Sequence, residues 1–459
     1  MTKMIYKKAY TIIIFLVLCA NMLTASGQQN SPAKKETAEE YVTRIRAMAD
    51  SIKLARTTNQ TATTTKGSGA AFSNGNYATN KATIDNAYNF LSPAEKEKVK
   101  KYPAVPEAFR NSEDAADFLN KLKGLDINAD VQQHAKEKSM ALFGFCISFQ
   151  STKTKAEKII KEANSLTTAF KKANPVMNFG TNVGKTYVSE NGLVYLPLGD
   201  ASFADEAMEA VYKTGNIQFP KENAVGQPNY VLMKDLKQNK GVYSLGNNGT
   251  LTLKFINNAL VDVAGPDLFV FEAGEIEPTN LEISKDGVLW VNVGKIGGGI
   301  ASVDISKVAT PMDCFYYVRF TDLNTKSTVA GADIDAVAAI GAAIKLSLTA
   351  EVLFDLGKAT LKPDGISAVN NLAQQLKQMN AAQISVDGYT DDIGNNDENL
   401  KLSKLRAEAV SAVLKEVLKS KDKFVYRETG RGESNPAVSN TTDANRKKNR
   451  RVEILVFPK

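Results

Sequence analysis

Strand-like and helix-like hydrophobic patterns alternate along residues 345–459 of this chain. Two helices are expected there: one begins at Pro363 and has apolar residues at steps of three and four, and the other follows Asp391. The order βαβαββ in one compact segment predicts a two-layer α/β sandwich. Four stretches have the composition of its strands: "LTAEVLFDL", "AQISVDGYT", "FVYRETG" and "RVEILVF".

Residues 176–344 have a different pattern. Short runs such as "LTLKF" and "VLWVNVG" alternate apolar and polar residues, and Lys285-Asp286-Gly287 signals a tight hairpin. Because no helical run separates these strands, the region is expected to be an antiparallel β-sandwich that is jelly-roll-like. It loosely resembles a β-sandwich module of bacterial secreted and surface proteins.

The first 175 residues contain two further segments, so the 459-residue chain is expected to be multidomain. Residues 28–175 have helical periodicity, and a Thr-, Ser-, Gly- and Asn-rich tract at about 57–80 predicts a flexible linker. Residues 1–27 have a lysine-rich start, an apolar run and small residues before Gln28, the pattern of a secretory signal peptide. We therefore expect export across the inner membrane.

The scarcity of histidine and cysteine limits the metal and catalytic sites that the chain can form. His134 is the only histidine, which argues against zinc sites and His-based triads, and its charged neighbours suggest a surface position. Cys146 and Cys314 remain after the expected cleavage; two separate thiols are favoured, but a disulfide stays open. Removing the three signal lysines lowers the formal net charge of +7 by three. This mild excess predicts no nucleic-acid binding.

Several aspartates lie at the expected ends of the central strands. Oxygen ligands from several loops suit Ca²⁺, so a structural calcium site is one interpretation of them. The alternative is that Asp favours turns because it bonds to nearby backbone. The calcium candidates are Asp200, Asp267, Asp333 and Asp335.

Two opposite charges follow the second strand of the C-terminal segment. Asp391 follows the strand, and Arg406 lies in the next helix, where its side chain can lean back toward the strand end. A carboxylate and a guanidinium in this arrangement fit a ligand that has an ammonium and a carboxylate on one carbon. The alternative is that the two charges pair with each other or with solvent.

The stretches "DGYTDDIGNNDENLKLSKLRAEAV" and "GRGESNPAVSNTTDANRKKNRRVEI" closely resemble the OmpA-like peptidoglycan-binding domain family over about residues 345–459. The resemblance implies that Asp391 holds the ammonium, and Arg406 the carboxylate, of diaminopimelate in the peptidoglycan stem peptide. It makes Asn399, Asn449 and Arg450 supporting residues, with Asn399 capping the helix or shaping the loop. Gly357 replaces an Asn that contacts the ligand in relatives.

Together these patterns predict a Gram-negative cell-envelope protein of the periplasm or outer membrane. Peptidoglycan is the expected partner, outer-membrane proteins are possible further partners, and no enzymatic activity is expected. The alternative is a glycan-binding or adhesive surface protein in which the central β-sandwich recognises the target and the C-terminal domain tethers it. The oligomeric state does not follow from the sequence.

Overall fold

A computed structural model describes residues 79–180, 183–189, 192–212, 219–229, 241–273, 277–310, 313–323, 331–379, 381–419 and 423–458. The expected signal peptide, the start of the expected helical region and nearly all of the linker lie outside these ranges. Within them, none of the helices has both the length and the apolar character that a membrane span requires.

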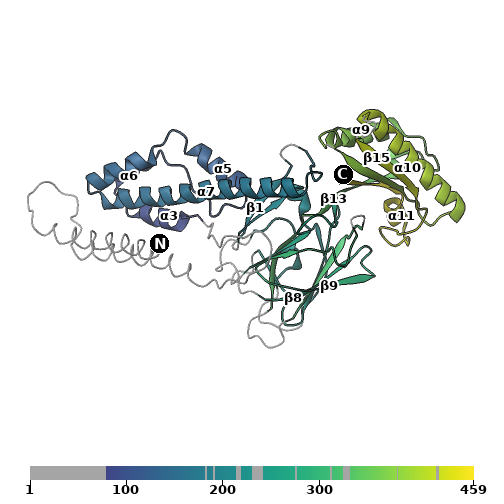
Figure 1. The fold of residues 1–459 in the computed structure, drawn as a ribbon, viewed down its shortest axis with the longest axis horizontal. Coiled ribbons are helices and arrows are strands. Elements are labelled where there is room, and N and C mark those ends of the chain that lie inside the picture. Colours follow the sequence, from purple (N-terminus) through teal and green to yellow (C-terminus); the bar gives the residue numbers. More distant parts are fainter. Residues whose placement is uncertain are drawn as a thin grey trace, which may run out of the picture. The chain divides into compact units, whose positions relative to one another are not determined.

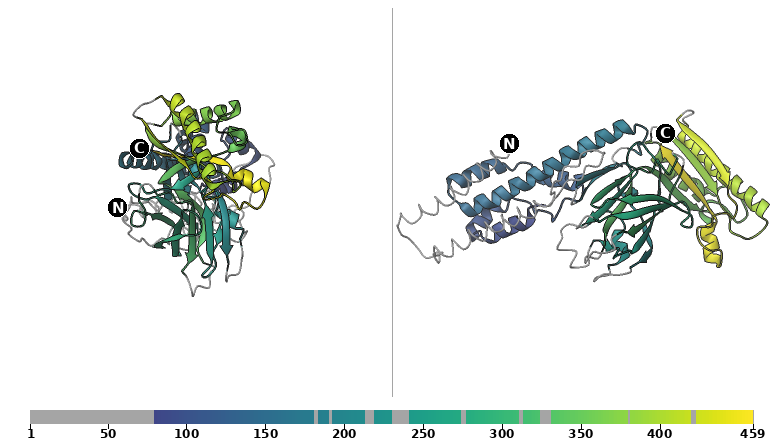
Figure 2. Two further views of the ribbon diagram at one scale, coloured as in Figure 1. Left: turned by 90° about the vertical axis from the view of Figure 1, so that its right-hand side faces the viewer. Right: turned by 60° about the horizontal axis from the view of Figure 1, so that its bottom comes forward.

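The N-terminal part of the described chain is helical, as predicted. Ser92 caps α4 (Pro93–Val99) and forms a capping box with Glu95, and Pro93 occupies the first turn. Three helices pack along the long α7 (Figure 2). His134 is not at the surface: it is 7% exposed and its Nδ1 lies 3.2 Å from a Glu137 carboxylate oxygen. The helices are α3 (Lys81–Asn89), α4 (Pro93–Val99), α5 (Ser112–Lys121), α6 (Ile127–Lys136) and α7 (Met140–Ala173).

The central part consists of antiparallel sheets, as predicted. One has the strand order β10-β7-β12-β4, the other β3-β5-β11-β8-β9, and β1 pairs with β2. Alternate apolar residues of the two larger sheets share one buried cluster, which explains their period of two. The strands are β1 (Lys185–Ser189), β2 (Gly192–Leu196), β3 (Glu206–Val211), β4 (Tyr243–Ser244), β5 (Thr250–Lys254), β6 (Asn258–Leu260), β7 (Leu268–Ala273), β8 (Thr279–Ser284), β9 (Trp290–Ile296), β10 (Ile300–Val303), β11 (Tyr317–Asp322) and β12 (Asp333–Ala339); η1 (Gly199–Ser202) and η2 (Lys221–Ala224) are 3₁₀ turns.

Cys146 and Cys314, the two cysteines among the described residues, are free thiols. Cys146 is buried in α7, and Cys314 is partly buried just before β11. Burial raises the pKa of the Cys314 thiol to about 12, so this thiol stays protonated near neutral pH.

The C-terminal part is a mixed sheet with the order β15-β14-β16-β13-β6. β14 and β15 are parallel, and β16 lies antiparallel between β14 and β13. Helices α9 and α10 lie against this sheet (Figure 1). Its elements are β13 (Ala342–Thr349), α8 (Ala350–Leu353), α9 (Pro363–Leu376), β14 (Ala382–Gly388), α10 (Asn396–Leu418), β15 (Phe424–Gly430), α11 (Asp443–Asn449) and β16 (Arg451–Pro458).

The first strand of this sheet differs from the prediction. "LTAEVLFDL" was expected to be extended, but β13 ends at Thr349 and α8 follows directly. β13 also begins earlier, at Ala342, and its first residues pair with β6 from the central part. Ala342 and Ala343 are fully buried. Close packing, rather than an alternation of apolar and polar residues, therefore explains their place in the sheet.

Candidate functional site

The order of the sheet brings three chain segments together at one edge. β16 pairs with both neighbours near its start, Val452 with Gly388 of β14 and Arg451 with Thr349 of β13. The loop after β14, the turn after β13 and the residues just before β16 therefore meet. Asp391, Glu351 and Arg450 lie in these three segments.

Asp391 lies in the loop between β14 and α10 and is only 7% exposed. Its Oδ1 accepts a hydrogen bond from the main-chain N–H of Ile393 at 3.2 Å, which fixes the direction of the carboxylate. A side chain at Gly388 would place its Cβ 2.1 Å from the carbonyl oxygen of Ser403. The end of β14 therefore packs directly on α10, and glycine is required there.

Arg406 is 3% exposed and is held by the loop that follows α8. Its Nε donates to the carbonyl oxygen of Lys358 at 3.0 Å, and its guanidinium carbon lies 5.3 Å from the centre of the Phe354 ring. Burial and the nearby Arg450 lower the pKa of Arg406, while the charge of Asp391 opposes this. The three charged groups thus lie within electrostatic reach of one another.

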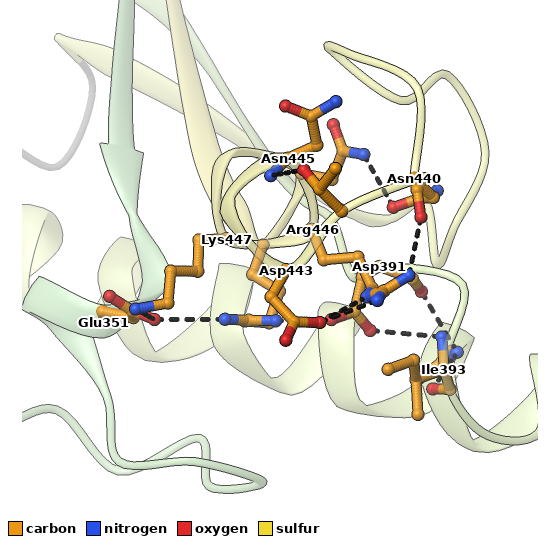
Figure 3. Close-up of polar contacts among 12 residues, drawn as sticks. Glu351, Asp391, Ile393, Asn440, Asp443, Asn445, Arg446 and Lys447 are labelled. Carbon is orange, nitrogen blue, oxygen red and sulfur yellow. Dashed lines mark hydrogen bonds and ion pairs between the residues drawn. The ribbon is translucent and has the colours of Figure 1, made fainter.

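Asp391 does not pair with Arg406 among the hydrogen bonds and ion pairs of the described residues; it pairs with Arg450. Nη1 of Arg450 lies 2.5 Å from Oδ2 of Asp391, and Nη2 lies 3.1 Å from Oε1 of Glu351. Glu351 is also 3.6 Å from Nζ of Lys447. Figure 3 shows Asp391 and Glu351 at the two ends of this set of contacts.

The side chains of the two predicted asparagines, Asn399 and Asn449, form hydrogen bonds with main-chain groups. Asn399 is not the helix cap: Asn395 caps α10 by accepting from the N–H of Asp397 at 2.9 Å. The amide of Asn399 instead donates to the carbonyl of Ile393 at 3.1 Å, so its role is to shape the loop. Asn449 is fully buried and bonds both main-chain groups of Val438.

Sequence reasoning missed Glu351. The residue lies in α8, a helix of four residues that was assigned to a strand, and so short a helix has no detectable period. Gly357 in the next loop has φ +71, and a Cβ added there would meet no atom within 4 Å, so backbone conformation alone explains the glycine.

The four predicted calcium ligands form no common cluster among the described residues, and each has partners of its own. Asp200 accepts from Lys185 at 3.1 Å and Asp335 from the N–H of Asn229 at 2.9 Å. Asp267 accepts from the N–H groups of Val263 and Ile305, and Asp333 interacts with Ser244. Among the described residues, Asp267 lies in a group of three acids with Asp262 and Asp304. The other candidates, Asp200, Asp333 and Asp335, are not members of this group. Calcium binding stays a prediction.

Comparison with known proteins concerns the C-terminal part. Residues 353–450 match the model of the OmpA family. The "Probable lipoprotein YiaD" of Escherichia coli (strain K12) is 34% identical over 143 residues, 31% of this chain and 64% of its own. "Outer membrane protein A" of Bordetella avium is 41% identical over 114 residues, 25% of this chain and 58% of its own.

A solved structure, the peptidoglycan-associated lipoprotein from Burkholderia pseudomallei, is 26% identical over 23% of this chain and 87% of that one, with a TM-score of 0.21. This chain spans less than two thirds of the two curated relatives named above. Asp391, Asn399, Arg406, Asn449 and Arg450 lie inside the matched residues, and Glu351 lies outside them.

Proposed function

Residues 353–450 match the OmpA family, and from this premise we propose that the chain binds peptidoglycan noncovalently through its C-terminal domain. The ligand group is the side-chain end of diaminopimelate in the stem peptide, which has an ammonium and a carboxylate on one carbon. Asp391 receives the ammonium and Arg406 the carboxylate.

One observation carries this proposal: a carboxylate and a guanidinium are both buried at one edge of the sheet, and their described contacts are with other groups. Burying unpaired charge is costly, so such groups are kept where a ligand or an internal partner compensates them. Nε of Arg406 donates a hydrogen bond to the main-chain carbonyl of Lys358. Among the described contacts, its two terminal nitrogens then remain for a carboxylate, which a guanidinium binds with two parallel hydrogen bonds.

The orientation of Arg406 also supports the proposal. The contact with the Lys358 carbonyl and the Phe354 ring limit the rotation of the guanidinium. An arginine fixed in this way loses little conformational entropy when a carboxylate binds. No bond is made or broken in this scheme, so the domain acts as an anchor rather than as an enzyme.

The cellular role follows from the ligand. Peptidoglycan lies in the periplasm, so the chain would be exported, as residues 1–27 suggest, and held at the cell wall beneath the outer membrane. The central sheets and the N-terminal helices would then be fixed near the wall, where outer-membrane proteins are accessible as partners.

The test is sedimentation of the purified full chain with peptidoglycan sacculi. The wild type is expected in the pellet, and Asp391→Ala or Arg406→Ala to weaken binding at least about tenfold, which is 1.4 kcal/mol. Matched controls are Asp392→Ala, an exposed acid in the same loop, and Lys401→Ala, an exposed base on the same helix. Circular dichroism checks that each variant is folded. Undiminished binding by both Asp391→Ala and Arg406→Ala overturns the proposal.

A further inference from the structure

Arg450 occupies the place where the proposed ligand would put its ammonium. Asp391 offers two oxygens: Oδ1 is engaged by the Ile393 N–H and Oδ2 by Nη1 of Arg450. An incoming ammonium therefore either displaces Arg450 from the carboxylate or shares the carboxylate with it. The arginine in turn is held at its other end by Glu351.

We propose that Arg450 is a built-in competitor for Asp391 and that Glu351, outside the family match, receives Arg450 when the ligand binds. This inference rests on the proposed function, because it assigns roles at the same site. It makes Arg450 a residue that determines ligand specificity and Glu351 a positioning residue that acts through Arg450.

The exposure of the partners supports this exchange. The side chain of Asp391 is 10% exposed and that of Glu351 is 52% exposed. An exposed carboxylate has freedom to follow a moving guanidinium, whereas Asp391 is fixed by the Ile393 N–H. Arg450 can thus leave Asp391 and keep Glu351, so it is never without a counter-ion.

The charges explain the specificity. Arg450 lies close enough to Arg406 to lower its pKa, so the two cations repel each other. A ligand carboxylate placed between them relieves this repulsion, but a ligand with an ammonium alone displaces Arg450 and adds a third positive charge. The site therefore favours a head group with both charges.

Two stem tripeptides that differ by one carboxylate test the proposal. They are L-Ala-γ-D-Glu-meso-diaminopimelate and L-Ala-γ-D-Glu-L-Lys, titrated into the full chain by calorimetry at low salt. The wild type is expected to prefer the diaminopimelate peptide. Arg450→Gln removes the competitor, so affinity for the lysine peptide should rise about threefold or more and the preference should fall at least about fivefold.

Lys447→Gln is the matched control, because Lys447 also contacts Glu351 but has no contact with Asp391 among the described ion pairs. It should leave the preference unchanged. Arg450→Lys keeps a cation and should keep the lysine peptide weakly bound. If Arg450→Gln is folded and its affinity for the lysine peptide is unchanged or lower, the proposal is overturned.

Glu351 is tested with a double-mutant cycle. Glu351→Gln should weaken binding of the diaminopimelate peptide about two- to fivefold, because Arg450 then loses its second partner. In the Arg450→Gln background the same change should have no effect. An equal effect in both backgrounds would show that Glu351 does not act through Arg450.

The outcomes separate this inference from the function on which it rests. If the wild type binds neither tripeptide, the proposed function fails. If the wild type binds the diaminopimelate peptide and Asp391→Ala abolishes this binding, while Arg450→Gln leaves the preference unchanged, the proposed function stands and the competitor role fails.

Discussion

The side-chain amide of Asn399 donates to the main-chain carbonyl of Ile393 at 3.1 Å and to that of Asp391 at 3.4 Å. Asn399 belongs to α10 and the two carbonyls belong to the preceding loop, so this residue ties the loop to the helix. The carboxylate of Asp391 and the guanidinium of Arg406 are thereby held in one frame.

Asn399→Ala should therefore weaken binding of the diaminopimelate peptide by about three- to tenfold, because the loop that carries Asp391 becomes free to move. The lost hydrogen bonds should also destabilise the domain by about 1 kcal/mol. Calorimetric titration measures the first effect. The control is Asn396→Ala, an exposed asparagine in the first turn of the same helix, and equal affinities for the two variants would contradict the role of Asn399.

Asn449→Ala should destabilise the structure around α11 more than it affects binding directly. Nδ2 of Asn449 donates to the carbonyl of Val438 and to Oδ1 of Asn440, each at 2.7 Å, and its Oδ1 accepts from the Val438 N–H at 3.0 Å. Alanine leaves these partly buried groups unpaired, at a cost of about 2 kcal/mol. The amide of Val438 should then exchange with deuterium about thirtyfold faster.

The control for this change is Asn445→Ala. The Asn445 amide donates to the carbonyl of Ser439 at 2.8 Å in an exposed position, where water can replace it. Exchange at Val438 should stay close to the wild-type rate in this variant. Similar exchange rates at Val438 in the Asn449→Ala and Asn445→Ala variants would show that the burial of Asn449 does not cause the faster exchange.

The central sheets should lose stability as the pH rises. Burial raises the pKa of Glu272 to about 8, and the charges of Glu277 and Asp333 add to this shift. Hydrogen bonds from the main-chain N–H groups of Gly299 and Glu277 oppose it. Burial likewise raises the pKa of Asp267 and of Asp333 to about 7. The folded protein binds these protons more tightly than the unfolded chain does. The stabilising contribution is therefore complete below about pH 4 and is lost as the pH rises through 7 and 8.

Urea unfolding followed by fluorescence of Trp290, the only tryptophan, measures this dependence, because the sheet that contains β9 shares a buried cluster with the sheet that contains Glu272 and Asp333. The free energy of unfolding should fall between pH 5 and 8, by up to about 1.4 kcal/mol per pH unit for each group. Glu272→Gln removes one of these titrating groups. The fall of the unfolding free energy with pH should then be less steep by up to about 1.4 kcal/mol per pH unit, whatever the effect on absolute stability. Glu209→Gln, an exposed acid of β3, should leave the slope unchanged, and a rising or flat wild-type curve would contradict the assignment.

Local patterns predicted many of the elements. Ser92 and Pro93 start α4, Pro363 starts α9, and the turn at Lys285-Asp286-Gly287 separates β8 from β9. These signals are encoded within a few residues, because caps, prolines and hairpin turns act on their own backbone. The short α8 and the early start of β13 have no such signal, and both were missed.

The candidate site was predicted in part. The local motif and the strand-to-helix boundary identified Asp391 and Arg406 as candidates, because both depend on neighbouring residues alone. The partners of Asp391 and Arg406 had no comparable signal. Glu351 was hidden in a segment with strand-like composition, and Asn399 was given two possible roles of which the contacts favour loop support.

The sequence by itself thus predicted the structural class of the three described parts of the chain and named the two opposite charges of the candidate site. Only the tertiary structure decided which groups those charges contact. Arg450 is 59 residues from Asp391 and 99 from Glu351 in the chain. The three meet because β16 lies between β14 and β13. Strand order depends on packing of the whole sheet against α9 and α10, and a local pattern contains no record of it.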